Sequence, residues 1–131
     1  MERLTIPATE RSPEVDFDFA GGRLSIRGES YPEDAAALFG PLFAALDRFL
    51  AASPGPAIRF DFELIYFNSS SAKALMNMFQ MLEKAAEGGR AVTVNWIFAP
   101  EDETMREFGE DFSEDLSHVR FHLVATPPDG G

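Results

Sequence analysis

Residues 57–67 form an alternating segment that leads without a break into a helical one. Apolar side chains occupy every second position from Ile58 to Tyr66, and this period of two predicts a β-strand. After Asn68-Ser69-Ser70-Ser71 the apolar spacing becomes helical and continues to Gly88-Gly89, where the helix is predicted to end. A strand that passes directly into a helix is the building unit of α/β proteins, so this segment predicts that fold class.

The flanking segments extend this unit into a mixed sheet. Alternating side chains on both sides of Gly21-Gly22 predict an N-terminal β-hairpin. Further strands are predicted at residues 91–98 and 119–124, and further helices at 30–50 and 101–116, the latter interrupted near Gly109. We therefore expect an α/β fold with a mixed β-sheet of about four to six strands and helices packed on it.

Local sequence also predicts details of two elements. Ser30 is expected to cap the helix at 30–50, with Glu33 returning the hydrogen bond and Pro32 in the first turn. Ile65 and Phe67 add apolar side chains to the second face of the strand at 57–67. This predicts that the far end of that strand is covered on both sides.

Length and charge limit the classes of function. The 131 residues fit one domain, which we place at 1–125, with a Pro- and Gly-rich flexible tail at 126–131. The net charge of −11 repels phosphate backbones and anionic lipid, so we expect neither nucleic-acid binding nor membrane insertion. The sequence has no cysteine, which excludes disulfides and thiolate chemistry, and no apolar leader precedes residue 7. We expect a cytoplasmic protein.

The strand–helix junction at Asn68-Ser69-Ser70-Ser71 holds three consecutive hydroxyl groups. The first backbone N–H groups of a helix are unpaired and its dipole is positive at that end, so a phosphate placed there is stabilised, with Lys73 nearby. A phosphoacceptor site is one interpretation. Helix capping is the other, since Asn and Ser are favoured caps, and spacing does not decide between them.

Other polar groups predict weaker candidates. Asp61 and Glu63 share a strand face and are a candidate acid–base pair in a catalytic or small-molecule site, although such pairs usually form a solvated face. His118 and His122 are spaced for one side of a strand but no third metal ligand accompanies them. Neither a nucleophile elbow nor a glycine-rich phosphate loop is present. We expect no metal, no cofactor and no catalytic residue.

Five motifs, in order, resemble the SiaC-like regulatory phosphoprotein family over about residues 4–123. They are Thr9-x-x-Ser12-Pro13-x-Val15, Gly22-x-Leu24-x-Ile26-x-Gly28-x-Ser30-Tyr31-Pro32-Glu33, Leu64-x-Tyr66-Phe67-Asn68-Ser69-Ser70-Ser71-x-Lys73, Val92-x-Val94-x-Trp96 and Asp102-x-x-Met105-x-x-Phe108-Gly109-Glu110-Asp111-Phe112. The resemblance implies a STAS-like fold, similar to that of anti-anti-sigma factors, and a non-enzymatic partner-switching function.

In that family a Ser/Thr protein kinase phosphorylates the regulator and a PP2C-like phosphatase reverses the reaction. The unphosphorylated form binds a target, in the founding system a diguanylate cyclase whose activity rises, which links the switch to cyclic di-GMP and biofilm control. The resemblance assigns the phosphoacceptor to Ser69, where relatives often have Thr, with Ser70 and Ser71 as alternatives. Asp34 stands where Asn is common.

The hypothesis from the sequence is therefore a phosphorylation switch at the strand–helix junction. Burying a phosphate dianion without a paired cation in a protein contact costs several kcal/mol, which releases the partner. The predicted partner-binding residues are Glu29, Ser30, Tyr31, Pro32, Glu33, Phe67, Asn68, Ser69, Ser70 and Lys73. The alternatives are a catalytic or small-molecule domain that uses Asp61 and Glu63, and a constitutive scaffold that is never phosphorylated.

Overall fold

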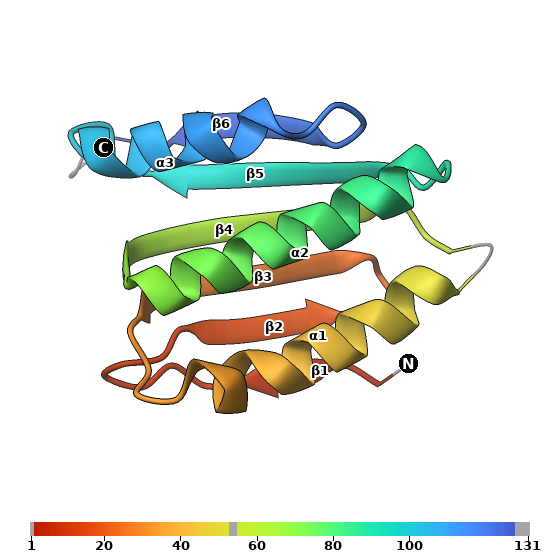
Figure 1. Ribbon diagram of the computed structural model, residues 1–131, viewed down its shortest axis with the longest axis horizontal. Coiled ribbons are helices and arrows are strands. Elements are labelled where there is room, and N and C mark those ends of the chain that lie inside the picture. The colour runs from red at the N-terminus through yellow and green to blue at the C-terminus, as the bar shows by residue number, and fades with distance from the viewer. Residues whose placement is uncertain (1, 53–54, 128–131) are drawn as a thin grey trace.

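The computed structural model describes residues 2–52 and 55–127, in which six strands form one sheet in sequence order, β1 to β6. The strands are β1 (Leu4–Ile6), β2 (Glu14–Asp18), β3 (Arg23–Ser30), β4 (Ile58–Phe67), β5 (Val92–Phe98) and β6 (Arg120–Ala125). The helices are α1 (Ala35–Ala51), α2 (Ser69–Glu87) and α3 (Glu103–Glu114). The expected α/β class, with a mixed sheet and helices packed on it, is confirmed (Figure 1).

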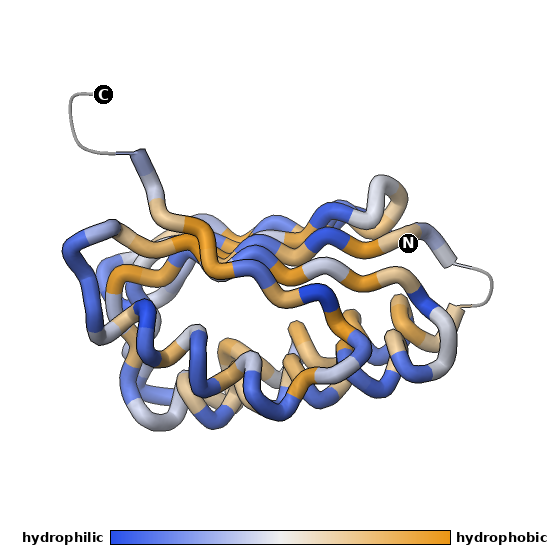
Figure 2. The backbone as a smooth tube through the Cα atoms, turned by 90° about the horizontal axis from the view of Figure 1, so that it is seen from above, coloured by the Kyte–Doolittle hydropathy of each residue, from blue (hydrophilic) through white to orange (hydrophobic). Residues whose placement is uncertain are grey.

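All three helices cover the same face of the sheet (Figure 2). β1, β2 and β3 pair antiparallel, and β3 to β6 pair parallel through α1, α2 and α3. Crossovers of one hand that step repeatedly in one direction place every helix on one side of a sheet. Among the residues that the structure describes, no helix covers the opposite face, which explains why the strands alternate apolar and polar side chains.

The predicted N-terminal hairpin is confirmed by the antiparallel pairing of β2 with β3. Its turn closes with a hydrogen bond from the Gly22 N–H to the Phe19 carbonyl, 3.2 Å. Gly22 has a φ of 69°, and a Cβ at this position would collide with the carbonyl oxygen of Ala57. Glycine is therefore required at this turn for both conformation and space.

The core lies between the sheet and the helices and is built largely from aromatic rings. The Phe62 ring stacks on Phe60 at 4.2 Å between centroids and lies 5.0 Å from Phe79 of α2. Trp96 of β5 is buried and its indole N–H donates to the Met105 carbonyl of α3, 2.8 Å. This bond satisfies the indole and ties α3 to the sheet.

The predicted start of the first helix is wrong. α1 begins at Ala35, and its N-cap is Asp34, whose carboxylate accepts a hydrogen bond from the Ala37 N–H, 3.1 Å. Ser30 instead ends β3 and is buried, and its hydroxyl is hydrogen-bonded to that of Ser71 in α2. The Ser30 side chain is thus part of the core rather than a helix cap.

The prediction that both faces cover the end of β4 is also wrong. Gly28 pairs with Leu64 but Glu29 pairs with Tyr66, so the register skips Ile65. The skip reverses the alternation: Phe67 turns into the core, whereas Ile65 and Tyr66 are 68% and 52% exposed. A short apolar surface therefore lies next to the start of α2.

The predicted interruption of the third helix is absent from α3, which is continuous through Gly109. Gly109 is buried against Trp96 and Leu123, and a Cβ there would overlap both side chains. The glycine allows close packing of α3 on the sheet. None of the helices that the structure describes is long and apolar enough to span a membrane.

Candidate functional site: the junction of β4 and α2

The junction begins where Asn68 caps α2, so helix capping, one of the two interpretations of this segment, applies to Asn68. The Asn68 side-chain oxygen accepts a hydrogen bond from the Ser71 N–H, 2.9 Å, and the Asn68 N–H donates to the Ser30 carbonyl, 3.0 Å. The cap is thus bonded to the ends of both β3 and α2. These bonds fix the direction in which α2 leaves the sheet and the position of its first turn.

The three serines of the junction differ in access to solvent. Ser71 is 0% exposed, and its hydroxyl donates to the Ser30 carbonyl at 3.0 Å and lies 2.8 Å from the Ser30 hydroxyl. Ser69 and Ser70 are exposed in the first turn. Ser71 therefore has a structural role in joining β3 to α2, and a kinase could reach only the hydroxyls of Ser69 and Ser70 without local unfolding.

The electrostatic environment of the exposed serines favours an anion. α2 has 19 residues, and its aligned peptide dipoles place partial positive charge at the Ser69 end. The Ser69 and Ser70 N–H groups lie in the first turn, where a helix supplies no backbone acceptor. Lys73, one turn further along, is exposed. The first turn of α2 can thus stabilise a phosphate on its own surface.

The segment at residues 29–33, which runs from the end of β3 into the connection to α1, is fixed beside the junction. The Tyr31 N–H donates to the Arg11 carbonyl, 2.8 Å, and the Arg11 guanidinium pairs with Glu33. The Tyr31 ring meets Tyr66 edge to face, with 5.8 Å between centroids. Tyr31 and the end of β4 therefore form one continuous surface.

The predicted partner-binding residues separate into two groups. Ser30 and Phe67 are buried, so their side chains support the surface from inside. The others lie at the surface, wholly or in part: Glu29, Tyr31, Pro32, Glu33, Asn68, Ser69, Ser70 and Lys73. Sequence reasoning did not identify two exposed apolar side chains, those of Met76, which is 52% exposed, and Phe108, which is 36% exposed. The signal for Met76 was present, since it is an apolar residue outside the buried stripe of its helix.

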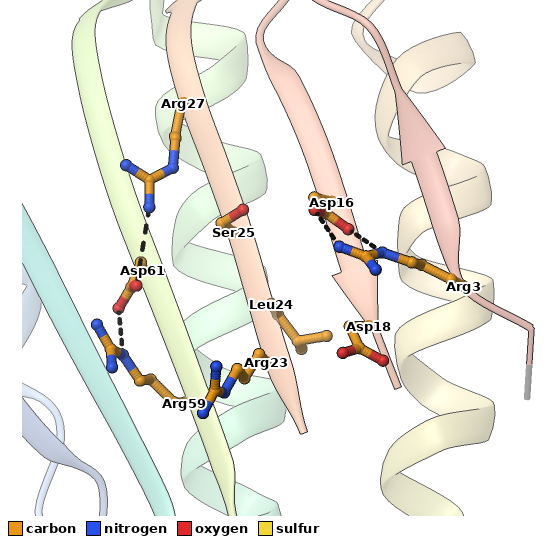
Figure 3. Close-up of a pocket in the computed structure, with 9 residues that line it drawn as sticks. All are labelled: Arg3, Asp16, Asp18, Arg23, Leu24, Ser25, Arg27, Arg59 and Asp61. Carbon is orange, nitrogen blue, oxygen red and sulfur yellow. Dashed lines mark hydrogen bonds and ion pairs between the residues drawn. The ribbon is translucent and has the colours of Figure 1, made fainter. Parts of the chain in front are cut away.

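The candidate acid–base pair lies on the helix-free face, where Asp61, but not Glu63, lines a depression of about 430 Å³ (Figure 3). Asp61 accepts hydrogen bonds from Asn95, 2.9 Å, and from Arg59, 3.3 Å. Glu63 accepts one from Arg27, 2.7 Å, whose guanidinium also lies 3.9 Å from Asp61. Both carboxylates are thus paired with arginines whose side chains are partly exposed, an arrangement typical of a charged protein surface.

The two histidines do not share one side of a strand, contrary to the prediction. His118 precedes β6 and its ring bonds Glu83 of α2, 2.8 Å, whereas His122 pairs in register with Asn95 on the helix-free face. Burial raises the pKa of Glu83, but hydrogen bonds from the His118 ring and from the N–H groups of residues 117–119 outweigh it and lower that pKa to about 2. Within residues 2–52 and 55–127, no cluster of three or more His, Asp and Glu side chains could hold a metal ion.

The sequence model of the SiaC family, described as SiaC family regulatory phosphoprotein, matches residues 6–126. The chain belongs to the SiaC family. An uncharacterized protein of Pseudomonas aeruginosa strain UCBPP-PA14 is 41% identical over 117 residues, which cover 89% of this chain and 92% of that protein.

Two solved structures of SiaC-family chains share the fold over nearly their whole length. The crystal structure of apo-SiaC from Pseudomonas aeruginosa superimposes with a TM-score of 0.86 at 38% identity, covering 95% of this chain and 100% of that one. The second is the crystal structure of the diguanylate cyclase SiaD in complex with its activator SiaC from Pseudomonas aeruginosa. Its matched chain has a TM-score of 0.89 at 39% identity, with 94% of this chain and 99% of that one covered.

One of the motifs that resemble the SiaC family builds α3. Asp102 caps the helix by accepting a hydrogen bond from the Met105 N–H, 3.0 Å. Met105 is buried and Phe112 is packed against the core, while the Phe108 ring lies 4.8 Å from that of Phe67. This motif therefore joins α3 to the end of β4 and extends the junction surface across the helix layer.

Proposed function

We propose that this SiaC-family chain is a non-enzymatic regulator that binds and activates a diguanylate cyclase when it is unphosphorylated. The family is one of regulatory phosphoproteins, and its member SiaC is an activator found in complex with the cyclase SiaD. The observation that carries the proposal is the exposed Ser69 hydroxyl at the first position of α2.

Ser69 is the proposed phosphoacceptor because it combines access with a stabilising environment. Its hydroxyl is exposed at the positive end of α2, whereas the hydroxyl of Ser71 is bonded inside the protein. The sequence resemblance supports this choice, because it implies an acceptor directly after the Asn of the strand–helix junction, which is Asn68 here. Ser70 is the alternative acceptor, since it shares the first turn.

The proposed switch acts through charge and requires no refolding. The proposed cyclase contact consists of the exposed residues at the start of α2, including Ser69 and Ser70, and of the segment at residues 29–33. A phosphate on Ser69 adds about −1.5 to −2 charges at this contact, and burying such a group against a partner costs several kcal/mol. The cyclase is then released. A Ser/Thr kinase and a PP2C-like phosphatase complete the cycle, and we place it in the cytoplasm, where ATP is available to the kinase.

The test compares matched variants in cyclase binding and activation. Each diguanylate cyclase of the source organism is purified and screened against the wild-type chain, and the one that binds is used thereafter. Ser69→Ala should bind like wild type, while Ser69→Asp should bind at least about tenfold more weakly, which corresponds to 1.4 kcal/mol. Ser71→Ala is the control, because it removes a hydroxyl from the same junction but leaves the exposed acceptors Ser69 and Ser70 in place.

The outcomes separate the proposal from its alternatives. Binding of Ser69→Asp at wild-type strength, with weakened Ser70→Asp, would move the acceptor to Ser70. If neither variant is weakened and intact mass never rises by one phosphate on incubation with kinases of the organism, the chain is a constitutive scaffold. Failure to bind any diguanylate cyclase would contradict the proposed target class.

A further inference from the structure

A row of arginines crosses the helix-free face of the sheet near the start of β3 and β4. Arg23 of β3 is in register with Arg59 of β4. From Arg59 the row continues through Thr93 of β5 to Arg120 of β6. Paired strands lie about 4.8 Å apart, and like charges at registered positions destabilise a sheet. Two guanidinium groups are thus held side by side against their own repulsion.

Both arginines keep N–H groups for a further acceptor. Arg59 donates to Asp61 through its Nε, 3.3 Å, which leaves its two Nη groups. Arg23 is exposed, and its guanidinium makes no ion pair with any residue in the ranges 2–52 and 55–127 (Figure 3). Asp18 is in register with Arg23 on the other side, but its carboxylate accepts from the Gly21 N–H, 3.2 Å. Two neighbouring planar guanidinium groups can hold one oxyanion through paired N–H donors.

The two arginines open into one recess, the depression of about 430 Å³ (Figure 3). Ser25 also lines it. Ser25 follows Arg23 by two residues in β3, so both side chains lie on the same face of the strand and the Ser25 hydroxyl is a third donor. The volume lies within the range of small-molecule sites. The recess therefore brings three donor side chains to a space larger than a single ion requires.

The charge of the depression differs in sign from that of the whole chain. Four arginines and three aspartates line it, whereas the net charge of the chain is −11. One of those aspartates, Asp16, is paired with Arg3 through two hydrogen bonds of 2.8 Å. Charges further away than the Debye length, about 8 Å at physiological ionic strength, are largely screened. The local charge therefore favours an anion at this place.

We propose that this depression binds the diphosphate group of a small molecule, with Arg23 and Arg59 as paired cationic donors and Ser25 as the third donor. Two adjacent guanidinium groups match two adjacent phosphates, each of which carries its own oxygens and charge. At about 3.3 Å per strand residue, Arg59 lies roughly 30 Å from Ser69. The site is thus remote from the proposed phosphoacceptor and does not depend on the proposed function.

The first test is an NMR titration of the full chain with sodium pyrophosphate and, separately, with ADP, at physiological ionic strength. Saturable shifts of the backbone signals of Arg23, Ser25 and Arg59 are expected with at least one of the two. Tighter binding of ADP would assign the site to a nucleotide diphosphate, and tighter binding of pyrophosphate to the free anion. Shifts confined to Ser69 and Ser70 in the first turn of α2, or no saturation with either probe, would overturn the proposal.

The second test measures the affinity of variants for the probe that binds more tightly. Arg23→Gln and Arg59→Gln should each weaken binding at least about tenfold, because each removes a pair of charge-assisted hydrogen bonds. Arg23→Lys should weaken it less, since it keeps the charge but loses the planar donor pair. Arg120→Gln is the matched control: it removes the same charge from the same row, two strands away from Arg59 and outside the depression. Its affinity should change less than about twofold.

Thermal unfolding separates a binding role of Arg23 from a structural one. The probe should raise the Tm of the wild type, because it binds the folded state, and should not raise that of Arg23→Gln. Without the probe, Arg23→Gln should unfold at or above the wild-type Tm, since it relieves the repulsion from Arg59. A lowered Tm together with an unchanged response to the probe would make Arg23 structural and overturn the proposal. So would an Arg120→Gln variant that loses as much affinity as Arg23→Gln, because the anion would then follow the charge of the whole face.

Discussion

The two faces of the sheet share the same strands but differ in the interactions of their side chains, which are apolar on one face and ionic on the other. On the helix-covered face, β4 presents Phe60 and Phe62 to a dry aromatic core. On the opposite face the same strand presents Arg59, Asp61 and Glu63. Arg59 pairs with Asp61 and Arg27 pairs with Glu63, and the side chains of both arginines are partly exposed to solvent. Apolar burial contributes most of the folding free energy, whereas exposed ion pairs contribute little. Most of the stability of the fold therefore comes from the helix-covered face.

The largest expected effect is on the covered face. Phe62→Ala removes a fully buried ring from among Phe60, Phe79 and Trp96, so the free energy of unfolding should fall by about 3–5 kcal/mol. Urea denaturation measures this change. A loss below about 1 kcal/mol would mean that the core is looser than its ring contacts indicate.

A smaller effect is expected for Asp61→Asn on the helix-free face. The substitution keeps an oxygen for the Asn95 amide but removes the charge that accepts from Arg59, a partner whose side chain is 62% exposed. We expect a loss of about 1 kcal/mol in urea denaturation. A loss as large as that of Phe62→Ala would contradict the difference between the two faces.

Glu83→Gln tests how much an ion pair contributes to stability on the helix-covered side, where Glu83 of α2 bonds His118. The low pKa of Glu83, about 2 against 4.5, gives stability that is full above pH 4.5 and lost as the pH falls. Its hydrogen bond raises the pKa of His118 above 6.5, and that contribution is lost as the pH rises through the raised value.

The stability difference between wild type and Glu83→Gln should therefore be largest between the ordinary pKa values of 4.5 and 6.5 and shrink on either side. Urea denaturation across this pH range measures it, with His118→Gln as the control that removes the upper limb alone. A difference that does not change with pH would show that the ion pair does not form.

The smallest effect is expected for Asp16→Asn, which removes charge on the same face as Asp61. Asp16 accepts two hydrogen bonds from Arg3, each 2.8 Å, but the two side chains are 34% and 58% exposed. The unfolding free energy should change by less than about 1 kcal/mol, and by less still in high salt. Equal losses for Asp16→Asn and Asp61→Asn would remove the distinction between buried and exposed charge on this face.

Sequence reasoning succeeded where local chemistry is strong and failed where pairing across the sheet decides. The hairpin at Gly22 and the end of α2 at Gly88 depend on neighbouring residues and are confirmed. Ser30 was assigned as a cap because the spacing to Glu33 fits one. Its hydroxyl bonds a residue 41 positions away, which no local pattern reveals.

Spacing and composition were sufficient to predict the order of strands and helices from β2 to β6, the acidic charge and the position of the serine-rich turn. Three features became visible only in the folded protein: which serines are exposed, the departure of Ile65 from the register of β4, and a groove between α2 and α3. Each of these depends on contacts between segments far apart in the chain, where the packing of rings and the pairing of buried hydroxyls outweigh local preference.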